Sequence, residues 1–142
     1  EPIVDIAVDA GKAILQVYAT EFDVQEKSDE SPLTQADLAS HRRIVAGLSE
    51  LTPEIPIISE EDGLPEFDER RHWARYWLID PLDGTSNFAI GIPYFAVSLA
   101  LVEDGQAFAY RKYLDQCDAQ EYLDAEIGQP AAVLPGHGDR RQ

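Results

Sequence analysis

Apolar residues recur at steps of three and four near the start of the chain, which predicts an amphipathic helix over residues 3–18. The stripe is formed by Ile3, Ile6, Ala10, Ile14 and Val17. Because one helical turn takes 3.6 residues, these side chains share one face and can be buried together. The polar, acidic residues 21–31 follow this helix and are expected to form a loop.

A second helix is predicted from residue 34 onward. Thr34 and Asp37 stand three positions apart, as in a capping box with Asp in place of the usual Glu. The apolar positions that continue this helix are Leu38, Ile44, Val45 and Leu48. Thr52-Pro53 ends it, because the residue before a proline disfavours the helical conformation.

Short apolar runs in the middle of the chain predict strands. Residues 55–58 contain Pro56, which cannot donate a ladder hydrogen bond, so this run is expected to be an edge strand or the entry to a strand. The charged residues 60–71 are expected to form a loop or a broken helix. Residues 76–79 predict a buried strand that stops at Asp80-Pro81, since proline again removes a donor from the ladder.

The strongest strand pattern covers residues 94–102. Asp104-Gly105 then turns the chain back into residues 106–113, which predicts a hairpin. Residues 114–127 are acidic and weakly helical in pattern, and residues 128–142 form a loose tail rich in Pro and Gly. We therefore predict an α/β fold of the α+β layered kind, in which two N-terminal helices pack on a largely antiparallel sheet.

Composition and charge narrow the function. The chain has 142 residues, 44% of them hydrophobic and 27% charged, which is typical of one globular domain. Its net charge of -16 repels phosphate backbones, so neither nucleic acid nor a membrane is an expected partner. No apolar run approaches the length that spans a bilayer. Cys117 is the single cysteine, which excludes an internal disulfide and fits a cytoplasmic location.

Carboxylates follow two of the predicted strands. Glu60 comes directly after one apolar run, within Ser59-Glu60-Glu61-Asp62, and Asp80 and Asp83 come directly after another. Asp37 lies in the first turn of the second predicted helix. Like charges gathered at neighbouring strand ends are costly unless a cation neutralises them, and oxygen ligands of this kind suit Mg²⁺.

The segment from Asp80 to Thr85 has two interpretations. Asp, Pro and Gly are common turn residues, so the segment is on one interpretation only a strand-ending turn, and the acidic run after Ser59 only a solvated loop. On the other, Asp80 and Asp83 share or bridge ions, and Gly84 lets a ligand approach the backbone. A helix that begins near Thr85 would add a phosphate site at its N-terminus.

The motifs resemble those of a known family. Ser59-Glu60-Glu61, followed by residues 77–85 with the sequence WLIDPLDGT, resembles the inositol monophosphatase superfamily of Mg²⁺-dependent, lithium-sensitive phosphatases. Residues 31–37 resemble the segment before that family's second helix. Residues 51–62 and 72–77 are most similar to the branch of 3'(2'),5'-bisphosphate nucleotidases of the CysQ type. The resemblance implies that residues 1–113 form an N-terminal metal-dependent phosphatase domain, truncated relative to the family, with residues 114–142 as a divergent acidic helix and tail.

The resemblance also implies site roles. Glu60, Asp80, the Leu82 carbonyl and Asp83 would hold two or more Mg²⁺ ions. Glu60 and Thr85, the latter hydrogen-bonded to Asp37, would orient and activate the attacking water. Asp83, Gly84 and Thr85 would contact the substrate, with the amides of Gly84 and Thr85 on its phosphate.

The implied reaction is removal of the 3'-phosphate from adenosine 3',5'-bisphosphate, a small phosphorylated substrate, with inhibition by Li⁺. An inositol-phosphate phosphatase is the alternative, because Ser86-Asn87-Phe88 is closer to that branch. The other alternative is a catalytically weak, metal-binding remnant of the family, because the family's distal Trp-Asp-x-Ala-Ala motif has only Asp118 as a weak counterpart. Such a remnant could form a homodimer. His41, His72 and His137 lack ligand spacing and are expected to be surface or packing residues.

Overall fold

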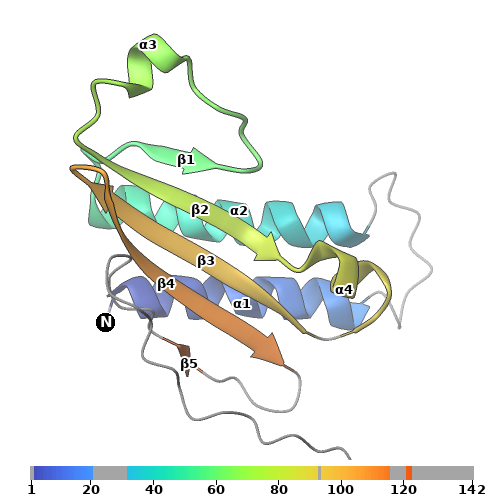
Figure 1. The fold of residues 1–142 in the computed structure, drawn as a ribbon. Helices are drawn as coiled ribbons and strands as arrows, with labels where there is room; N and C mark the ends of the chain where they lie inside the picture. Colours follow the sequence, from blue (N-terminus) through green and yellow to red (C-terminus); the bar gives the residue numbers. More distant parts are fainter. Residues whose placement is uncertain (1, 21–31, 93, 116–120, 123–142) are drawn as a thin grey trace, which may run out of the picture.

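The computed structural model describes residues 2–20, 32–92, 94–115 and 121–122. Figure 1 shows two long helices lying side by side on one face of a sheet. In chain order the elements are α1 (Pro2–Thr20), α2 (Pro32–Leu51), β1 (Ile57–Ser59), α3 (Phe67–Arg70), β2 (Arg75–Asp83), α4 (Thr85–Ala89), β3 (Tyr94–Glu103), β4 (Gln106–Asp115) and β5 (Glu121–Tyr122). The predicted fold class, two N-terminal helices on a largely antiparallel sheet, is confirmed.

The sheet has the strand order β1-β2-β3-β4-β5. β1 pairs with β2 in parallel, and each of the other neighbouring pairs is antiparallel. β1 lies at an edge, as predicted, although Pro56 stays outside the strand and its carbonyl accepts the Trp77 N–H at 2.8 Å. The turn between β3 and β4 is made by Asp104 and Gly105, both with positive φ, which confirms the predicted hairpin.

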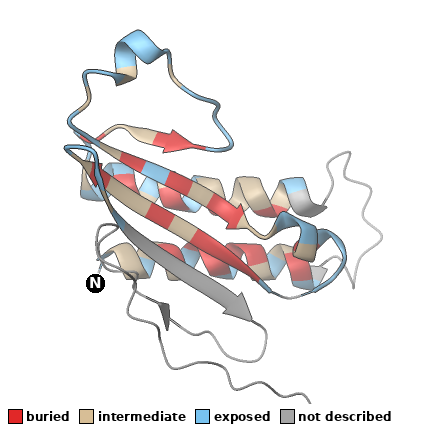
Figure 2. Ribbon diagram, in the orientation of Figure 1, coloured by how far each residue is buried: buried red, intermediate tan, exposed pale blue. Residues whose placement is uncertain are grey.

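The core lies between the two helices and the sheet, and the buried residues of Figure 2 follow the inner stripes of both layers. α2 buries one residue per turn, at Ala36, Ser40, Ile44 and Leu48. The two helices approach closely at Gly47, where an added Cβ would lie 2.7 Å from Ile6. A larger residue at this position would therefore push α1 away from α2.

The prediction that the strand stops at Asp80-Pro81 was wrong. β2 continues to Asp83, and its pairing with β3 shifts register between Asp80 and Asp83. Proline is tolerated in a strand at such an irregularity, because the residue there need not donate to the ladder. The consequence is that Asp80 and Asp83 both lie on β2 and flank the bulge.

The helical pattern predicted for residues 114–127 was also wrong where the structure describes them. Leu114 and Asp115 complete β4, and Glu121–Tyr122 form β5. The other residues of that segment, including Cys117 and Asp118, lie outside the described residues. The division of the chain at residue 113 stays a prediction.

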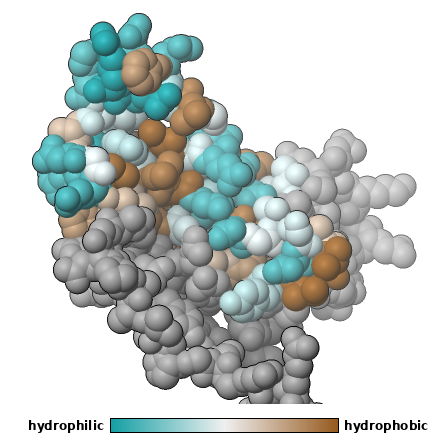
Figure 3. Space-filling view, viewed as in Figure 1, coloured by the Kyte–Doolittle hydropathy of each residue, from teal (hydrophilic) through white to brown (hydrophobic). Residues whose placement is uncertain are grey.

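The sheet face turned away from the helices carries apolar residues. Leu78 on β2 is 47% exposed there, opposite Ala100 of β3. Figure 3 shows hydrophobic surface over this part of the sheet, with hydrophilic residues around it. Among the described residues, no helix has both the length and the apolarity needed to cross a membrane.

Candidate active site

The parallel pairing of β1 with β2 brings two carboxylates to neighbouring positions. Ser59 pairs with Ile79, and the Glu60 N–H extends the ladder by donating to the Ile79 carbonyl at 3.3 Å. The next residue on each chain segment is therefore Glu60 on one side and Asp80 on the other. Because β1 and β2 run side by side in the same direction, the residues that follow Ser59 and Ile79 lie next to each other. The two acidic motifs therefore meet although Glu60 and Asp80 are twenty positions apart in the sequence.

The bulge in β2 orients the second motif. The Leu82 N–H donates to Asp80 Oδ1 at 3.2 Å, which fixes that carboxylate beside the irregular backbone. The Leu82 side chain is buried in the core and anchors the segment. Asp83 ends β2 opposite Ala96 of β3. The sequence Asp-Pro-Leu-Asp thus holds two carboxylates on either side of a buried anchor.

Gly84 links β2 to α4 with a φ of 94°, a conformation that L residues rarely adopt. A Cβ at this position would lie 3.3 Å from Phe95 Cα and from the Tyr94 carbonyl oxygen. The close approach at Gly84 is to the backbone of β3, and a ligand's approach to this turn stays a prediction. A helix, α4, does begin at Thr85, as the second interpretation of this segment required, and the Thr85 side chain is exposed.

An aromatic cluster holds α4 in place. Phe88 contacts Tyr18 of α1 and Phe95 of β3, with ring centroids 5.5 Å and 5.6 Å apart. The Tyr18 hydroxyl donates to the Gly91 carbonyl at 2.7 Å, and the Asn87 side chain donates to the Tyr94 carbonyl at 2.8 Å. The start of α4 is therefore fixed relative to the bulge by contacts on both sides.

The carboxylates disturb one another's ionisation. Burial raises the pKa of Asp37 from 3.8 to about 7, and repulsion from Glu61, Asp80 and Glu60 adds to this. Burial likewise raises the pKa of Asp80 to about 6, with Glu60 and Asp83 as the next causes, against a lowering by the Leu82 N–H. The structure thus brings the predicted residues Asp37, Glu60, Asp80 and Asp83 into one electrostatic cluster.

This cluster fits a hard divalent cation by its chemistry. All its donors are carboxylate oxygens, and a nearby cation would relieve both the burial cost and the repulsion. Within the described part of the chain, no three His, Cys, Asp or Glu side chains are arranged to hold an ion as they stand. Binding an ion would therefore require carboxylate side chains to turn toward one another.

Thr85 and Asp37 are placed at this end of the sheet by different elements. Among the hydrogen bonds of the described residues, none joins the Thr85 hydroxyl to Asp37, so that pairing stays a prediction. The roles of Leu82, Gly84 and Thr85 toward ions or phosphate also stay predictions. The weak candidate Asp118 lies outside the described residues.

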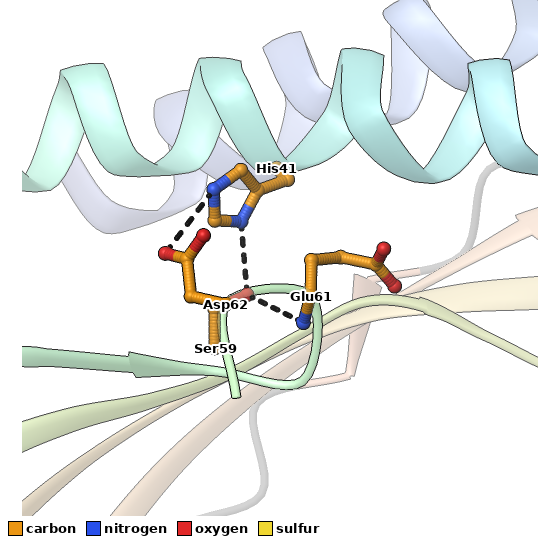
Figure 4. A network of polar contacts seen from close by, with 4 residues as sticks. All are labelled: His41, Ser59, Glu61 and Asp62. Atoms are coloured by element: carbon orange, nitrogen blue, oxygen red, sulfur yellow. Dashed lines mark hydrogen bonds and ion pairs between the residues drawn. The ribbon is translucent and has the colours of Figure 1, made fainter. Parts of the chain in front are cut away.

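Sequence reasoning missed a histidine at this site. His41 was expected to be a surface or packing residue, but its Nδ1 lies 2.9 Å from Ser59 Oγ and its Nε2 lies 3.4 Å from Asp62 Oδ2. Figure 4 shows the ring reaching from α2 to the turn after β1. Its spacing of four from Asp37 was the available signal, because residues four apart share a helix face.

Comparison with known proteins agrees with this arrangement. The model of the inositol monophosphatase family matches residues 1–109. The chain belongs to this family. The matched residues include the two long helices α1 and α2, the carboxylate cluster and α4.

Individual relatives of this inositol monophosphatase family member carry the name of the nucleotidase branch. The 3'(2'),5'-bisphosphate nucleotidase CysQ of Salmonella typhimurium is 48% identical over 108 residues, covering 75% of this chain and 44% of the relative. The protein of the same name from Escherichia coli K12 is 46% identical with the same coverage. The chain thus spans less than half the length of these curated relatives.

Solved structures give the same fold. The CysQ of Bacteroides thetaiotaomicron, a bacterial member of the inositol monophosphatase family, superposes with a TM-score of 0.68 at 31% identity, over 92% of this chain and 51% of that chain. The inositol monophosphatase of Anabaena superposes with a TM-score of 0.65 at 26% identity, over 87% and 42%.

Proposed function

We propose that this chain carries the site of a Mg²⁺-dependent phosphomonoesterase that removes the 3'-phosphate of adenosine 3',5'-bisphosphate. The observation that carries the proposal is the cluster of mutually repelling carboxylates, in a chain 48% identical to a bisphosphate nucleotidase over 108 residues. A group of like charges that is partly buried, as at Asp37 and Asp80, is destabilising by itself, so its presence points to a positively charged occupant.

In this proposal Glu60, Asp80, Asp83 and the Leu82 carbonyl hold the Mg²⁺. The ion, when bound, supplies positive charge that favours deprotonation of water and stabilises the oxygens of the transferred phosphoryl group. The bulge in β2 contributes by presenting Asp80 and Asp83 on either side of the buried Leu82 side chain. The hydrogen bond from the Leu82 N–H favours the ionised form of Asp80 and so lowers its pKa, against the larger effect of burial.

The remaining residues act on the substrate and the water. The turn at Gly84 and the start of α4 at Thr85 offer main-chain amides to the phosphate, next to Asp83. The exposed Thr85 hydroxyl orients the attacking water together with Glu60, and Asp37 accepts the Thr85 hydroxyl hydrogen. Because α4 is held by Phe88 and Asn87, its first main-chain amides are positioned before the substrate arrives.

Two alternatives have specific support. Ser86-Asn87-Phe88 after Thr85 favours an inositol-phosphate phosphatase. A metal-binding remnant with weak catalysis is favoured by residues 110–142, which lie outside the match to the family. Under the proposed function and under both alternatives, three further properties stay predictions: inhibition by Li⁺, a cytoplasmic location and a homodimer.

The deciding experiment measures phosphate release from adenosine 3',5'-bisphosphate and from inositol 1-phosphate as the Mg²⁺ concentration is raised. We expect slow release from the nucleotide that needs high Mg²⁺, and a further loss in Thr85→Ala. Ser49→Ala, which removes an exposed hydroxyl from α2, is the matched control. Preference for inositol 1-phosphate would select the first alternative, and Mg²⁺ binding without any release would select the second.

A further inference from the structure

Two adjacent residues of α2 each reach a different carboxylate-bearing segment. The Ser40 hydroxyl donates to the Pro81 carbonyl at 2.7 Å, in the bulge between Asp80 and Asp83. The His41 ring contacts Ser59, the residue directly before Glu60, at 2.9 Å. α2 is therefore bonded to both acidic motifs within about one helical turn of its own Asp37.

The bond from Ser40 satisfies a carbonyl in the irregular part of β2. Pro81 lies where the pairing of β2 with β3 shifts register. Ser40 is 0% exposed and Pro81 is also among the fully buried side chains. A buried carbonyl without a partner is costly, so the hydroxyl stabilises the bulge in the form that presents Asp80 and Asp83.

The bond from His41 orders the turn after β1. Ser59 Oγ accepts the Glu61 N–H at 3.3 Å and lies 2.9 Å from His41 Nδ1, and a serine hydroxyl can serve both hydrogen bonds at once. The other ring nitrogen, Nε2, lies 3.4 Å from Asp62 Oδ2. Figure 4 shows this chain of contacts from α2 into the turn.

The same contacts exclude a nucleophilic role for this serine. A histidine between a serine and an aspartate resembles an arrangement that activates serine, but Ser59 is only 2% exposed. A substrate carbon or phosphorus atom cannot reach a hydroxyl that is buried and already engaged. The contacts therefore serve to hold elements together.

We propose that Ser40 and His41 are positioning residues that fasten α2 to the two acidic segments and so set the separation of Asp37, Glu60 and Asp80. The proposal rests on the proposed function, since its purpose is to hold repelling carboxylates where an ion can bind. Asp37 precedes His41 by one turn, and the helix between them is rigid, so fixing His41 also fixes the Asp37 backbone. Without the two bonds, repulsion would move α2 away from the strand ends.

The test compares Ser40→Ala and His41→Ala with Thr52→Val. Thr52 follows α2, and its hydroxyl oxygen accepts the Trp77 Nε1–H at 3.0 Å, so it also links this region to β2, but at a position before Asp80 on the strand. Ser40→Ala loses one hydrogen bond, His41→Ala loses its contacts with Ser59 and Asp62, and Thr52→Val loses its bonds with Trp77 and with the Leu48 carbonyl. Each variant should lower the midpoint of urea unfolding in EDTA. Mg²⁺ affinity, measured by titration calorimetry, should fall about tenfold or more in the Ser40 and His41 variants only.

A conservative variant separates positioning from general damage. His41→Asn offers an amide oxygen to the Ser59 hydroxyl, so it should recover Mg²⁺ affinity to within about threefold of wild type while still lacking the Asp62 contact. This variant also keeps the test decisive if His41→Ala does not fold.

Three outcomes overturn the proposal. Unchanged Mg²⁺ affinity in both alanine variants would refute positioning while leaving the metal site intact. An equal loss of affinity in Thr52→Val would show that the effect is only one of stability. A wild-type chain that binds no Mg²⁺ would remove the proposed function itself, and the positioning role with it.

Discussion

Replacing Asp37 with asparagine should stabilise the metal-free protein above neutral pH. The asparagine side chain is nearly isosteric with the carboxylate it replaces and carries no charge to repel Glu61, Asp80 and Glu60. The substitution therefore removes the repulsion and the burial cost of the charge without opening a cavity. A stabilising substitution of an acidic residue is unusual and follows directly from the electrostatic argument.

The magnitude follows from the shifted pKa. The rise in the pKa of Asp37 from 3.8 to about 7 corresponds to an upper limit of about 4 kcal/mol at 1.36 kcal/mol per unit. Because Asp37 is only half-buried, solvent screening reduces this to about 1–2 kcal/mol. We expect Asp37→Asn to raise the free energy of unfolding by that amount at pH 8.

The sign of the pH dependence is fixed by the direction of the shift. Below pH 3.8 both states of the protein hold the Asp37 proton, so the residue costs nothing. Between that value and about 7 the unfolded chain has lost the proton while the folded chain keeps it, so stability falls as the pH rises. Above about 7 the full cost is present. The gain from Asp37→Asn should therefore be smaller at pH 5 than at pH 8.

Urea unfolding in EDTA at pH 5 and pH 8 measures this difference. Glu54→Gln, which removes one charge from an exposed turn, controls for the change in net charge. A gain in Asp37→Asn that is absent at pH 8, or equal at both pH values, would refute the assignment of Asp37 to the carboxylate cluster.

Three further predictions concern the ion and the turn. Asp80→Asn should abolish Mg²⁺ binding in calorimetry with an unchanged circular dichroism spectrum, and normal affinity would contradict its place in the ion site. Millimolar Mg²⁺ should raise the melting temperature above that in Na⁺ at equal ionic strength, because an ion that binds only the folded cluster stabilises it; equal melting temperatures would argue against a site. Gly84→Ala should destabilise the fold by about 1–3 kcal/mol, because φ is 94° at this position and the added Cβ would contact Phe95. Gly63→Ala, whose added Cβ meets nothing within 4 Å, should destabilise the fold less. Equal losses of stability in thermal unfolding would show that the close approach to Phe95 does not matter.

Local pattern alone determined the two long helices and the hairpin of this protein. The three- and four-residue steps of residues 3–18 predicted α1, and the strand pattern of residues 94–102 with the Asp104-Gly105 turn predicted the hairpin of β3 and β4. Helix and hairpin bonds join residues close in the chain, so the information needed lies within a short window. The acidic motifs around Glu60 and Asp80 were likewise visible, because each directly follows an apolar run.

Tertiary structure decided how those motifs are held. Nothing in the residues around Pro81 indicates that β2 continues through a bulge, because that depends on pairing with β3 and on the Ser40 hydroxyl from α2. The role of His41 was hidden for the same reason, since its partners Ser59 and Asp62 are eighteen and twenty-one positions away. The raised pKa of Asp37 also arises from carboxylates on other elements. Contacts between residues distant in sequence exist only once helices and strands have packed, and burial and repulsion act through those contacts.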